Sequence, residues 1–105
     1  MAQYDVYPNP NPRSRDSVPY VVDVQSDLLD VLRTRLAVPL SRIGVERPGL
    51  PRRLIPIVVV KGERLAVHPH EAAGIEARLL RRRVVSIAEH AGEIRDALDA
   101  VVSGI

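Results

Sequence analysis

The residues best suited to chemistry in this chain are two histidines and a glutamate in the segment His68-Pro69-His70-Glu71. Histidines at positions i and i+2 of an extended segment point the same way, and zinc accepts imidazole and carboxylate ligands. A zinc site needs three or four ligands in a closed geometry. The chain has no cysteine, and His90 falls on a separate predicted helix. We therefore expect surface histidines here and no metal site.

A second candidate is the cationic patch formed by Arg78 and Arg81-Arg82-Arg83. Guanidinium groups bind phosphates and carboxylates, so the patch could hold either phosphates or an acidic partner segment. Single-strand nucleic-acid binding adds aromatic side chains for stacking, and none lies between these arginines. A solvated charged surface is an equally good interpretation. The chain contains no Gly-rich phosphate loop, G-x-S-x-G or H-E-x-x-H motif, so nothing in it requires catalysis.

These side chains must be positioned by a fold whose clearest element is a helix predicted over Ser86–Ile105. Ser86 and Glu89 have the spacing of a capping box, and Gly104 is typical of a helix end. One apolar stripe recurs at helical spacing and predicts the face that packs on a core. Its members are Ile87, Ala91, Ile94, Leu98, Val101 and Val102.

The composition is that of one small globular domain. The chain has 105 residues, 46% of them hydrophobic and 27% charged, with no Trp and no Phe. The core must therefore consist of Val, Leu, Ile and Ala, and the abundant valines favour strands. A net charge of +2 is too small to imply nucleic-acid binding. The N-terminus lacks a signal-peptide pattern, and the longest apolar run, Ile55–Val60, cannot span a membrane, so we expect a cytoplasmic protein.

Short strands separated by turns are predicted upstream of the helix. Thr34–Leu40 should end at Pro39, and Arg53–Val60, the most apolar run, should be a central strand. Lys61-Gly62 should be the tight turn of a hairpin. Short strands followed by one terminal helix indicate a mostly antiparallel sheet or barrel covered by that helix. The other expected extended segments are Tyr4–Tyr7, Pro19–Gln25, Glu63–Val67 and Ile75–Val85.

Two loops are candidates for partner contacts. Pro8, Pro10 and Pro12 alternate with asparagine, which predicts an exposed, extended loop over Pro8–Ser17 that either protects a sheet edge or binds a partner. Leu28 and Leu29 are adjacent apolar residues in a polar turn, so we expect at least one to be exposed.

Several segments together resemble the CcdB family of toxins. They are V-V-D-V-Q-S-D-L-L-D at Val21–Asp30, L-A-V-P-L at Leu36–Leu40, L-I-P-I-V-V-V at Leu54–Val60, the amphipathic helix and the ending Gly104-Ile105. The resemblance covers nearly the whole chain. It implies one domain of the α+β, mainly β class: an SH3-like antiparallel barrel with a C-terminal helix.

The same resemblance implies the toxin half of a type II toxin–antitoxin pair. Such toxins are cytoplasmic homodimers, not enzymes, and need no cofactor. They bind the A subunit of DNA gyrase and trap the covalent complex of gyrase with cleaved DNA. A CcdA-like antitoxin removes them through a disordered segment that folds on the toxin. The pair represses its own operon, and operator DNA is bound only through the antitoxin.

The resemblance also assigns site residues, with no catalytic or metal-binding residue among them. The implied gyrase-binding residues are Ser26, Leu28, Leu29, Asp99, Val102, Ser103, Gly104 and Ile105. The implied antitoxin-binding residues are Asn9, Pro10, Asn11, Pro12, Arg13, Ser14 and Arg15.

The chain departs from the family pattern at Ser103, where the family has Trp before the final Gly-Ile. A Trp there offers a large flat surface of the kind that dominates binding energies, and serine does not. Two other interpretations therefore stay open. One is a relative that has lost gyrase poisoning and keeps antitoxin binding. The other is a MazF-like endoribonuclease toxin, because those ribonucleases share this barrel and a fold does not determine a function.

Overall fold

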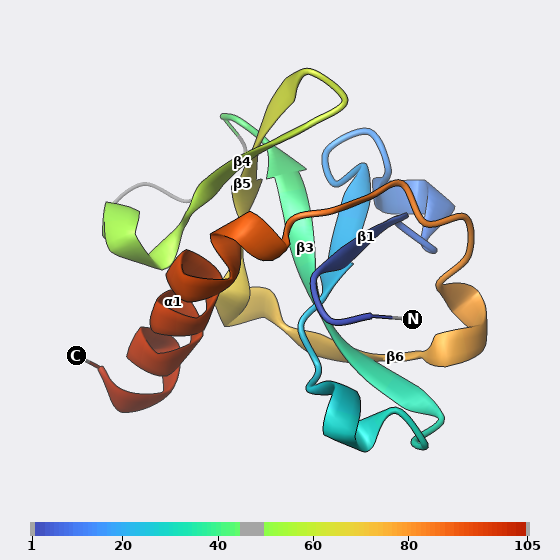
Figure 1. The fold of residues 1–105 in the computed structure, drawn as a ribbon. Helices are drawn as coiled ribbons and strands as arrows, with labels where there is room; N and C mark the ends of the chain where they lie inside the picture. Colours follow the sequence, from blue (N-terminus) through green and yellow to red (C-terminus); the bar gives the residue numbers. More distant parts are fainter. Residues whose placement is uncertain (1, 45–49, 105) are drawn as a thin grey trace.

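The long strand β3, Thr34–Arg42, organises the sheet in the computed structural model, which describes residues 2–44 and 50–104. One edge of β3 pairs with β2 (Tyr20–Asp23), and its other edge pairs with β5 (Glu63–Val67) at one end and with β6 (Ala73–Glu76) at the other. All pairings are antiparallel, and the sheet curls into a nearly closed barrel (Figure 1). The other described strands are β1 (Asp5–Pro8), β2 (Tyr20–Asp23), β4 (Ile57–Val60), β5 (Glu63–Val67), β6 (Ala73–Glu76) and β7 (Val85–Ser86).

One α-helix among the described residues, α1 (Ala91–Ser103), lies beside the barrel and packs on two 3-10 helices, η3 (Arg52–Leu54) and η4 (Pro69–Glu71) (Figure 1). This arrangement confirms the predicted class, a mainly β barrel with a C-terminal helix. No helix in the described part of the chain is long and apolar enough to cross a bilayer. The 3-10 helices are η1 (Pro12–Ser14), η2 (Asp27–Leu29), η3 (Arg52–Leu54), η4 (Pro69–Glu71), η5 (Ala77–Leu79) and η6 (Ala88–His90).

The core is built from aliphatic side chains that alternate along the strands. Val22 of β2 points into the main cluster, where it meets residues such as Val38, Leu65 and Ile94. Its neighbour Val21 points to the opposite face, as the pleat requires, and is also buried, in a smaller cluster with Tyr7, Ala37 and Leu80. Strand β2 is therefore covered on both faces, which explains why Val21 and Val22 are both apolar, while the strand ends in the buried Asp23.

The prediction that Pro39 ends its strand is wrong. Pro39 lies inside β3, opposite Val21 of β2. Its carbonyl accepts a hydrogen bond of 3.0 Å from the His68 backbone N–H. Proline has no N–H to donate in return. The ladder between β3 and β5 accordingly stops beside Pro39 while the ladder to β2 continues.

The prediction that Arg53–Val60 forms a central strand is also wrong. Arg53 belongs to η3, and the strand itself, β4, sits at the end of the sheet and pairs only with β5 among the described strands. Val58 and Val60 point into the core while Val59 is 57% exposed, so β4 is apolar without being central. The expected turn is confirmed, because Lys61 and Gly62 both have positive φ, as tight hairpin turns with a right-handed twist require.

The helix begins later than predicted. Ser86 is in β7, paired with Asp5, and its hydroxyl accepts a hydrogen bond from the Ala88 N–H rather than capping α1. Gly104 ends the helix as predicted, with a φ of 75° in the left-handed region. Ala97 and Ala100 complete the buried face, whereas Val101 and Val102, both predicted to pack, are 40% and 87% exposed.

The predicted extended segment Ile75–Val85 is broken in the structure. It contains the end of β6, the 3-10 helix η5 and the beginning of β7. The predicted extended loop Pro8–Ser17 likewise contains η1. Asparagine and serine side chains stabilise such local turns, and periodicity alone does not reveal them.

Candidate functional site

Leu28 and Leu29 lie on η2, a short turn that projects from the barrel. The Ser26 hydroxyl accepts a hydrogen bond of 3.2 Å from the Leu28 N–H and so caps the turn. Leu28 is 91% exposed and Leu29 is 48% exposed, which confirms the expectation that at least one leucine faces solvent. The turn therefore presents apolar side chains in a fixed backbone conformation.

A buried polar network holds this turn on the barrel. Arg35 of β3 is 1% exposed, and its Nε donates to Asp23 Oδ2 at 2.7 Å. The same guanidinium lies 3.6 Å from Asp27, the first residue of η2. The Gln25 side-chain amide donates to the carbonyls of Leu29 and Thr34, both at 3.1 Å. Both ends of the η2 loop are thus bonded to groups inside the barrel.

Burial and the neighbouring Arg35 have opposing effects on the pKa of the Asp23 carboxyl group. Burial raises the pKa of the Asp23 carboxyl group, because the charged form loses its hydration. The hydrogen bond from Arg35 acts in the other direction and favours the carboxylate. Either group alone would be a buried charge without a partner, so each one requires the other.

The second predicted group of gyrase-binding residues lies at the end of α1. Asp99, Val102, Ser103 and Gly104 are all exposed. The Ser103 hydroxyl donates to the Asp99 carbonyl at 2.7 Å, so its polar group is turned back onto the helix. Ile105 lies outside the described residues. This end of the helix contributes an exposed surface that the barrel does not use.

The two groups form separate projections in one copy of the chain. Ser26, Leu28 and Leu29 share η2 and its cap, while the other described members share the C-terminal end of α1. Figure 1 shows η2 and the end of α1 apart, with the helix extending away to the C-terminus. A partner that touches both must span the surface between them.

The loop with the predicted antitoxin-binding residues is held together from within. Asn9 is 6% exposed, and its side-chain amide donates to the Ser14 hydroxyl and the Val18 carbonyl. The Arg15 Nε donates to the Asn9 carbonyl at 2.6 Å. Asn9 therefore shapes the loop, while the exposed members can meet a partner. Those exposed members are Asn11, Pro12, Arg13 and Arg15, with Pro10 and Ser14 partly buried.

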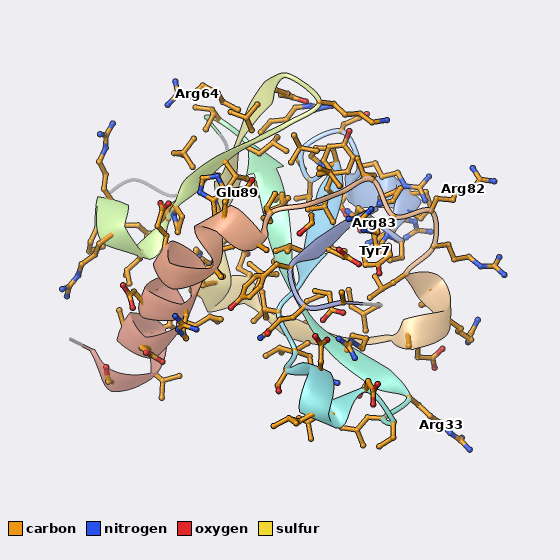
Figure 2. All side chains as sticks on the ribbon, viewed as in Figure 1. Tyr7, Arg33, Arg64, Arg82, Arg83 and Glu89 are labelled. Carbon is orange, nitrogen blue, oxygen red and sulfur yellow. The ribbon has the colours of Figure 1, made fainter. Side chains whose placement is uncertain are left out.

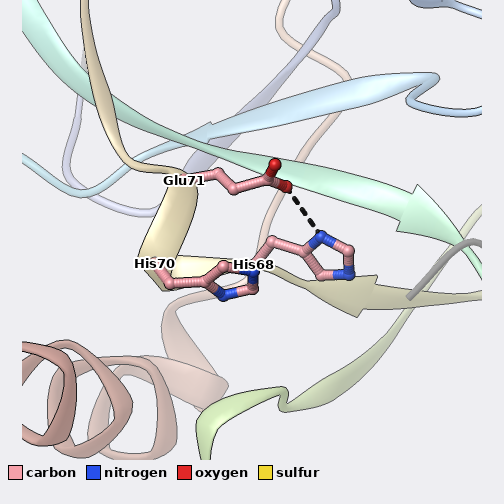
Figure 3. A group of neighbouring side chains, drawn as sticks. All are labelled: His68, His70 and Glu71. Atoms are coloured by element: carbon pink, nitrogen blue, oxygen red, sulfur yellow. Dashed lines mark hydrogen bonds and ion pairs between the residues drawn. The ribbon is translucent and has the colours of Figure 1, made fainter. Parts of the chain in front are cut away.

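The cluster of His68, His70 and Glu71 is shown in Figure 3. One possible ligand atom from each residue lies within 4.8 Å of the others, and the imidazole rings stack with centroids 5.1 Å apart. His68 Nδ1 lies 2.9 Å from Glu71 Oε1, and its Nε2 is buried without a hydrogen-bond partner. The expectation of surface histidines is therefore wrong for His68, which is 4% exposed, and holds for the exposed His70. This geometry favours a structural Nδ1–H···carboxylate bond.

The four arginines of the predicted cationic patch do not act together. Arg83 pairs with Asp5 at 2.9 Å, and Arg78 pairs with Glu76 at 2.7 Å. Arg81 and Arg82 are exposed and form no ion pair with any residue in the described ranges. Figure 2 shows Arg82 projecting from the molecule while Arg83 lies near Tyr7. The patch thus divides into two paired arginines and two free cations.

The family comparison agrees with this barrel and helix. The family model for CcdB protein matches residues 3–104, nearly the whole chain. The match includes η2, the Asn9–Arg15 loop and α1, the three elements described above. The chain therefore belongs to the CcdB family.

Proposed function

We propose that this CcdB-like toxin acts on DNA gyrase: it binds the A subunit of the enzyme and traps the complex of gyrase with cleaved DNA. Family membership supports a toxin of this type. The observation that carries the proposal is the rigid presentation of Leu28 and Leu29, exposed leucines fixed by the buried Arg35–Asp23 network. A preorganised apolar turn loses little conformational entropy on binding, so such a turn suits a protein partner.

The proposed mechanism is binding and not catalysis. Leu28 and Leu29 would insert into an apolar surface of gyrase while the exposed end of α1 contacts a neighbouring part. Trapping follows if the bound toxin stabilises the cleaved state more than the resealed one, since a ligand shifts an equilibrium only by its differential affinity. No bond in the DNA has to be made or broken by the toxin.

One observation favours a second function, in which the chain has lost gyrase poisoning and retains antitoxin binding. Ser103 stands where the family pattern has Trp, and its hydroxyl is bonded to the Asp99 carbonyl. It offers a partner neither a flat apolar surface nor a free donor. An anchoring Trp is worth about 2 kcal/mol or more on truncation, which corresponds to about a thirtyfold change in affinity.

A gyrase–DNA cleavage-complex assay separates these two functions. Wild type, Ser103→Trp and the matched control Ser103→Ala are compared at equal concentration. Cleaved DNA with wild type and with Ser103→Ala supports gyrase poisoning by this chain. Cleaved DNA with Ser103→Trp alone supports the loss of poisoning. No cleavage complex with any of the three contradicts both gyrase interpretations.

Ribonuclease activity is the remaining alternative, and the described site does not favour it. His68, a candidate acid or base, is buried and bonded to Glu71, and the free cations Arg81 and Arg82 lie on a different segment. General acid–base cleavage of RNA needs the acid or base and the phosphate-binding cation within reach of one phosphate. Incubation of the pure protein with a long RNA tests this alternative. RNA cleavage by wild type that is lost in His70→Ala would support the ribonuclease interpretation.

A further inference from the structure

Three metal-ligating side chains meet at the turn η4, on a different element from either group of proposed gyrase-binding residues (Figure 3). His68 directly follows β5, and His70 and Glu71 belong to η4. One ligand atom from each residue lies within 4.8 Å of the others. Zinc binds imidazole nitrogen and carboxylate oxygen, with three or four ligands in all. Four consecutive residues thus supply a set of three ligands.

The backbone of this turn is already fixed by its own contacts. The Glu71 N–H donates to the His68 carbonyl at 3.0 Å, and a 3-10 turn places side chains three residues apart on the same side. The His68 N–H donates to the Pro39 carbonyl of β3, also at 3.0 Å. Pro69, between the ligands, is buried and has a fixed φ. Little backbone ordering therefore remains to oppose binding of a ligand.

The spacing of two of the ligand atoms is close to what a shared ion requires. With bonds of ~2.1 Å, two ligands of one zinc ion lie ~3.0–3.4 Å apart. His68 Nδ1 lies 2.9 Å from Glu71 Oε1. The His70 ring is stacked on that of His68 with centroids 5.1 Å apart, so it must rotate to bring a nitrogen into range. His70 is exposed, and exposed side chains change rotamer freely.

An ion at this position would replace one proton. Without a metal, the Nδ1–H of His68 lies between its own ring and Glu71. When a metal displaces that proton from Nδ1, the neutral imidazole carries its proton on Nε2 instead. Nε2 is buried with no described partner, and it lacks that partner in both tautomers, so its burial does not oppose the exchange.

The carboxylate of Glu71 is available to a cation. Its side chain is 56% exposed, and its one ion-pair partner among the described residues is His68. No lysine or arginine in the described ranges therefore has to be displaced before an ion binds.

We propose that His68 Nδ1, a ring nitrogen of His70 and Glu71 Oε1 bind one divalent transition-metal ion of the zinc type, with water completing its coordination. Imidazole ligands suit zinc, copper and nickel, whereas magnesium and calcium take oxygen ligands. Because η4 packs on α1, the ion stabilises the junction between the turn and the helix. The site does not depend on gyrase binding.

The chain contains a matched comparison at the start of α1. His90 Nδ1 lies 3.0 Å from Glu93 Oε1, with the same spacing of three residues along the chain. Within the described residues, no second imidazole joins this pair. Two ligands are fewer than zinc needs. Zinc should therefore bind at His68 and not at His90.

The test is addition of Zn²⁺ to the untagged protein, followed by NMR of the histidine ring nitrogens. The chain has 3 histidines, so His70→Ala and His90→Ala together assign every signal. One equivalent of zinc should shift the ring signals of His68 and His70 and leave those of His90 unchanged. Isothermal titration calorimetry should give one zinc ion per chain, and Mg²⁺ should not bind.

Substitutions at the exposed ligands test the site without disturbing the buried His68. His70→Ala and Glu71→Gln should each weaken zinc binding about tenfold or more, since even the loss of a partner outside the ligand shell has that effect. The matched controls His90→Ala and Glu93→Gln should stay within about twofold of wild type. Zinc at about ten times its dissociation constant should raise the Tm of wild type by about 5 °C or more, and this gain should be lost in His70→Ala.

The metal site is ruled out if wild type binds no zinc, if His90 shifts as much as His68, or if His70→Ala binds as tightly as wild type. Zinc shifts at His68 alone would also rule it out, because the second imidazole would then have no part. Gyrase trapping is measured on the same variants and should be unchanged in His70→Ala, which lies on neither η2 nor α1. Zinc binding without trapping would contradict the proposed function and leave the metal site intact.

Discussion

Arg35 shows how a single buried charge can support an exposed binding element. It is 1% exposed, bonded to Asp23 inside the barrel, and close to Asp27 at the start of η2. A buried ion pair adds little stability relative to apolar packing, so its value lies in fixing a geometry. In this protein the geometry is that of the turn carrying Leu28 and Leu29.

Replacing Arg35 with methionine should lower the free energy of unfolding by about 3–5 kcal/mol, because Asp23 is left as an unpaired buried charge. Adding Asp23→Asn should restore more than half of that loss, since the remaining amide carries no charge. Urea denaturation of both variants measures the difference. The control is Arg64→Met at an exposed site, which should cost less than about 0.5 kcal/mol. A single variant as stable as wild type would show that the pair is not needed.

Leu28→Asp should separate binding from folding. Leu28 is 91% exposed, so the change should alter the free energy of unfolding by no more than about 0.5 kcal/mol. Gyrase binding should weaken about tenfold or more, because the new carboxylate replaces an apolar contact and would have to lose its hydration on binding. Val59→Asp, at an exposed valine on β4, is the matched control and should bind gyrase normally. Equal binding by both variants would remove η2 from the gyrase site.

At the scale of elements, the sequence predicted those features that depend on neighbouring residues. The Lys61-Gly62 turn and the Gly104 helix end follow from positive φ angles that few residue types adopt easily. The start of α1 was missed because Ser86 pairs with Asp5, a partner far away in the chain. The edge position of β4 was missed for the same reason, since apolarity reports burial and not sheet order.

The candidate site likewise has features that the sequence predicts and features that it does not. Exposed leucines in a polar turn could be predicted from Leu28 and Leu29 themselves. The buried network of Arg35 and Asp23 could not be predicted from the sequence, because a charged residue in a strand is normally exposed and nothing local links these two residues.

The hairpin turn between β4 and β5 gives a test at this scale. Lys61 has a φ of 50°, and asparagine tolerates that conformation better than lysine. Lys61→Asn should therefore raise the free energy of unfolding by about 0.5–1 kcal/mol, while Gly62→Ala, at a φ of 79°, should lower it by about 1 kcal/mol. Thermal denaturation measures both changes. A loss of stability in Lys61→Asn would show that another contact holds this turn.

At the scale of the whole molecule, the separation of the two groups of proposed gyrase-binding residues argues for a dimer. One copy carries Leu28 and Leu29 on η2 and the exposed Val102 on α1, on separate projections. A two-fold interface would repeat both groups and match a target that is itself two-fold symmetric. Several large apolar side chains remain exposed in the single copy and are available for such contacts. Those outside the proposed gyrase-binding set include Val31, Leu32, Leu36 and Val101.

We therefore expect a homodimer with twice the chain mass of 11.6 kDa in light scattering at micromolar concentration. On dilution below the dimer dissociation constant, the fraction of chains in the dimer falls by mass action. Trapping of gyrase should therefore decrease more steeply than the toxin concentration itself. A tandem chain that joins two copies through a flexible linker should keep its activity on dilution, because the second copy stays at high effective concentration. A monomer at micromolar concentration that still traps gyrase would contradict the dimer and require one copy to span both projections.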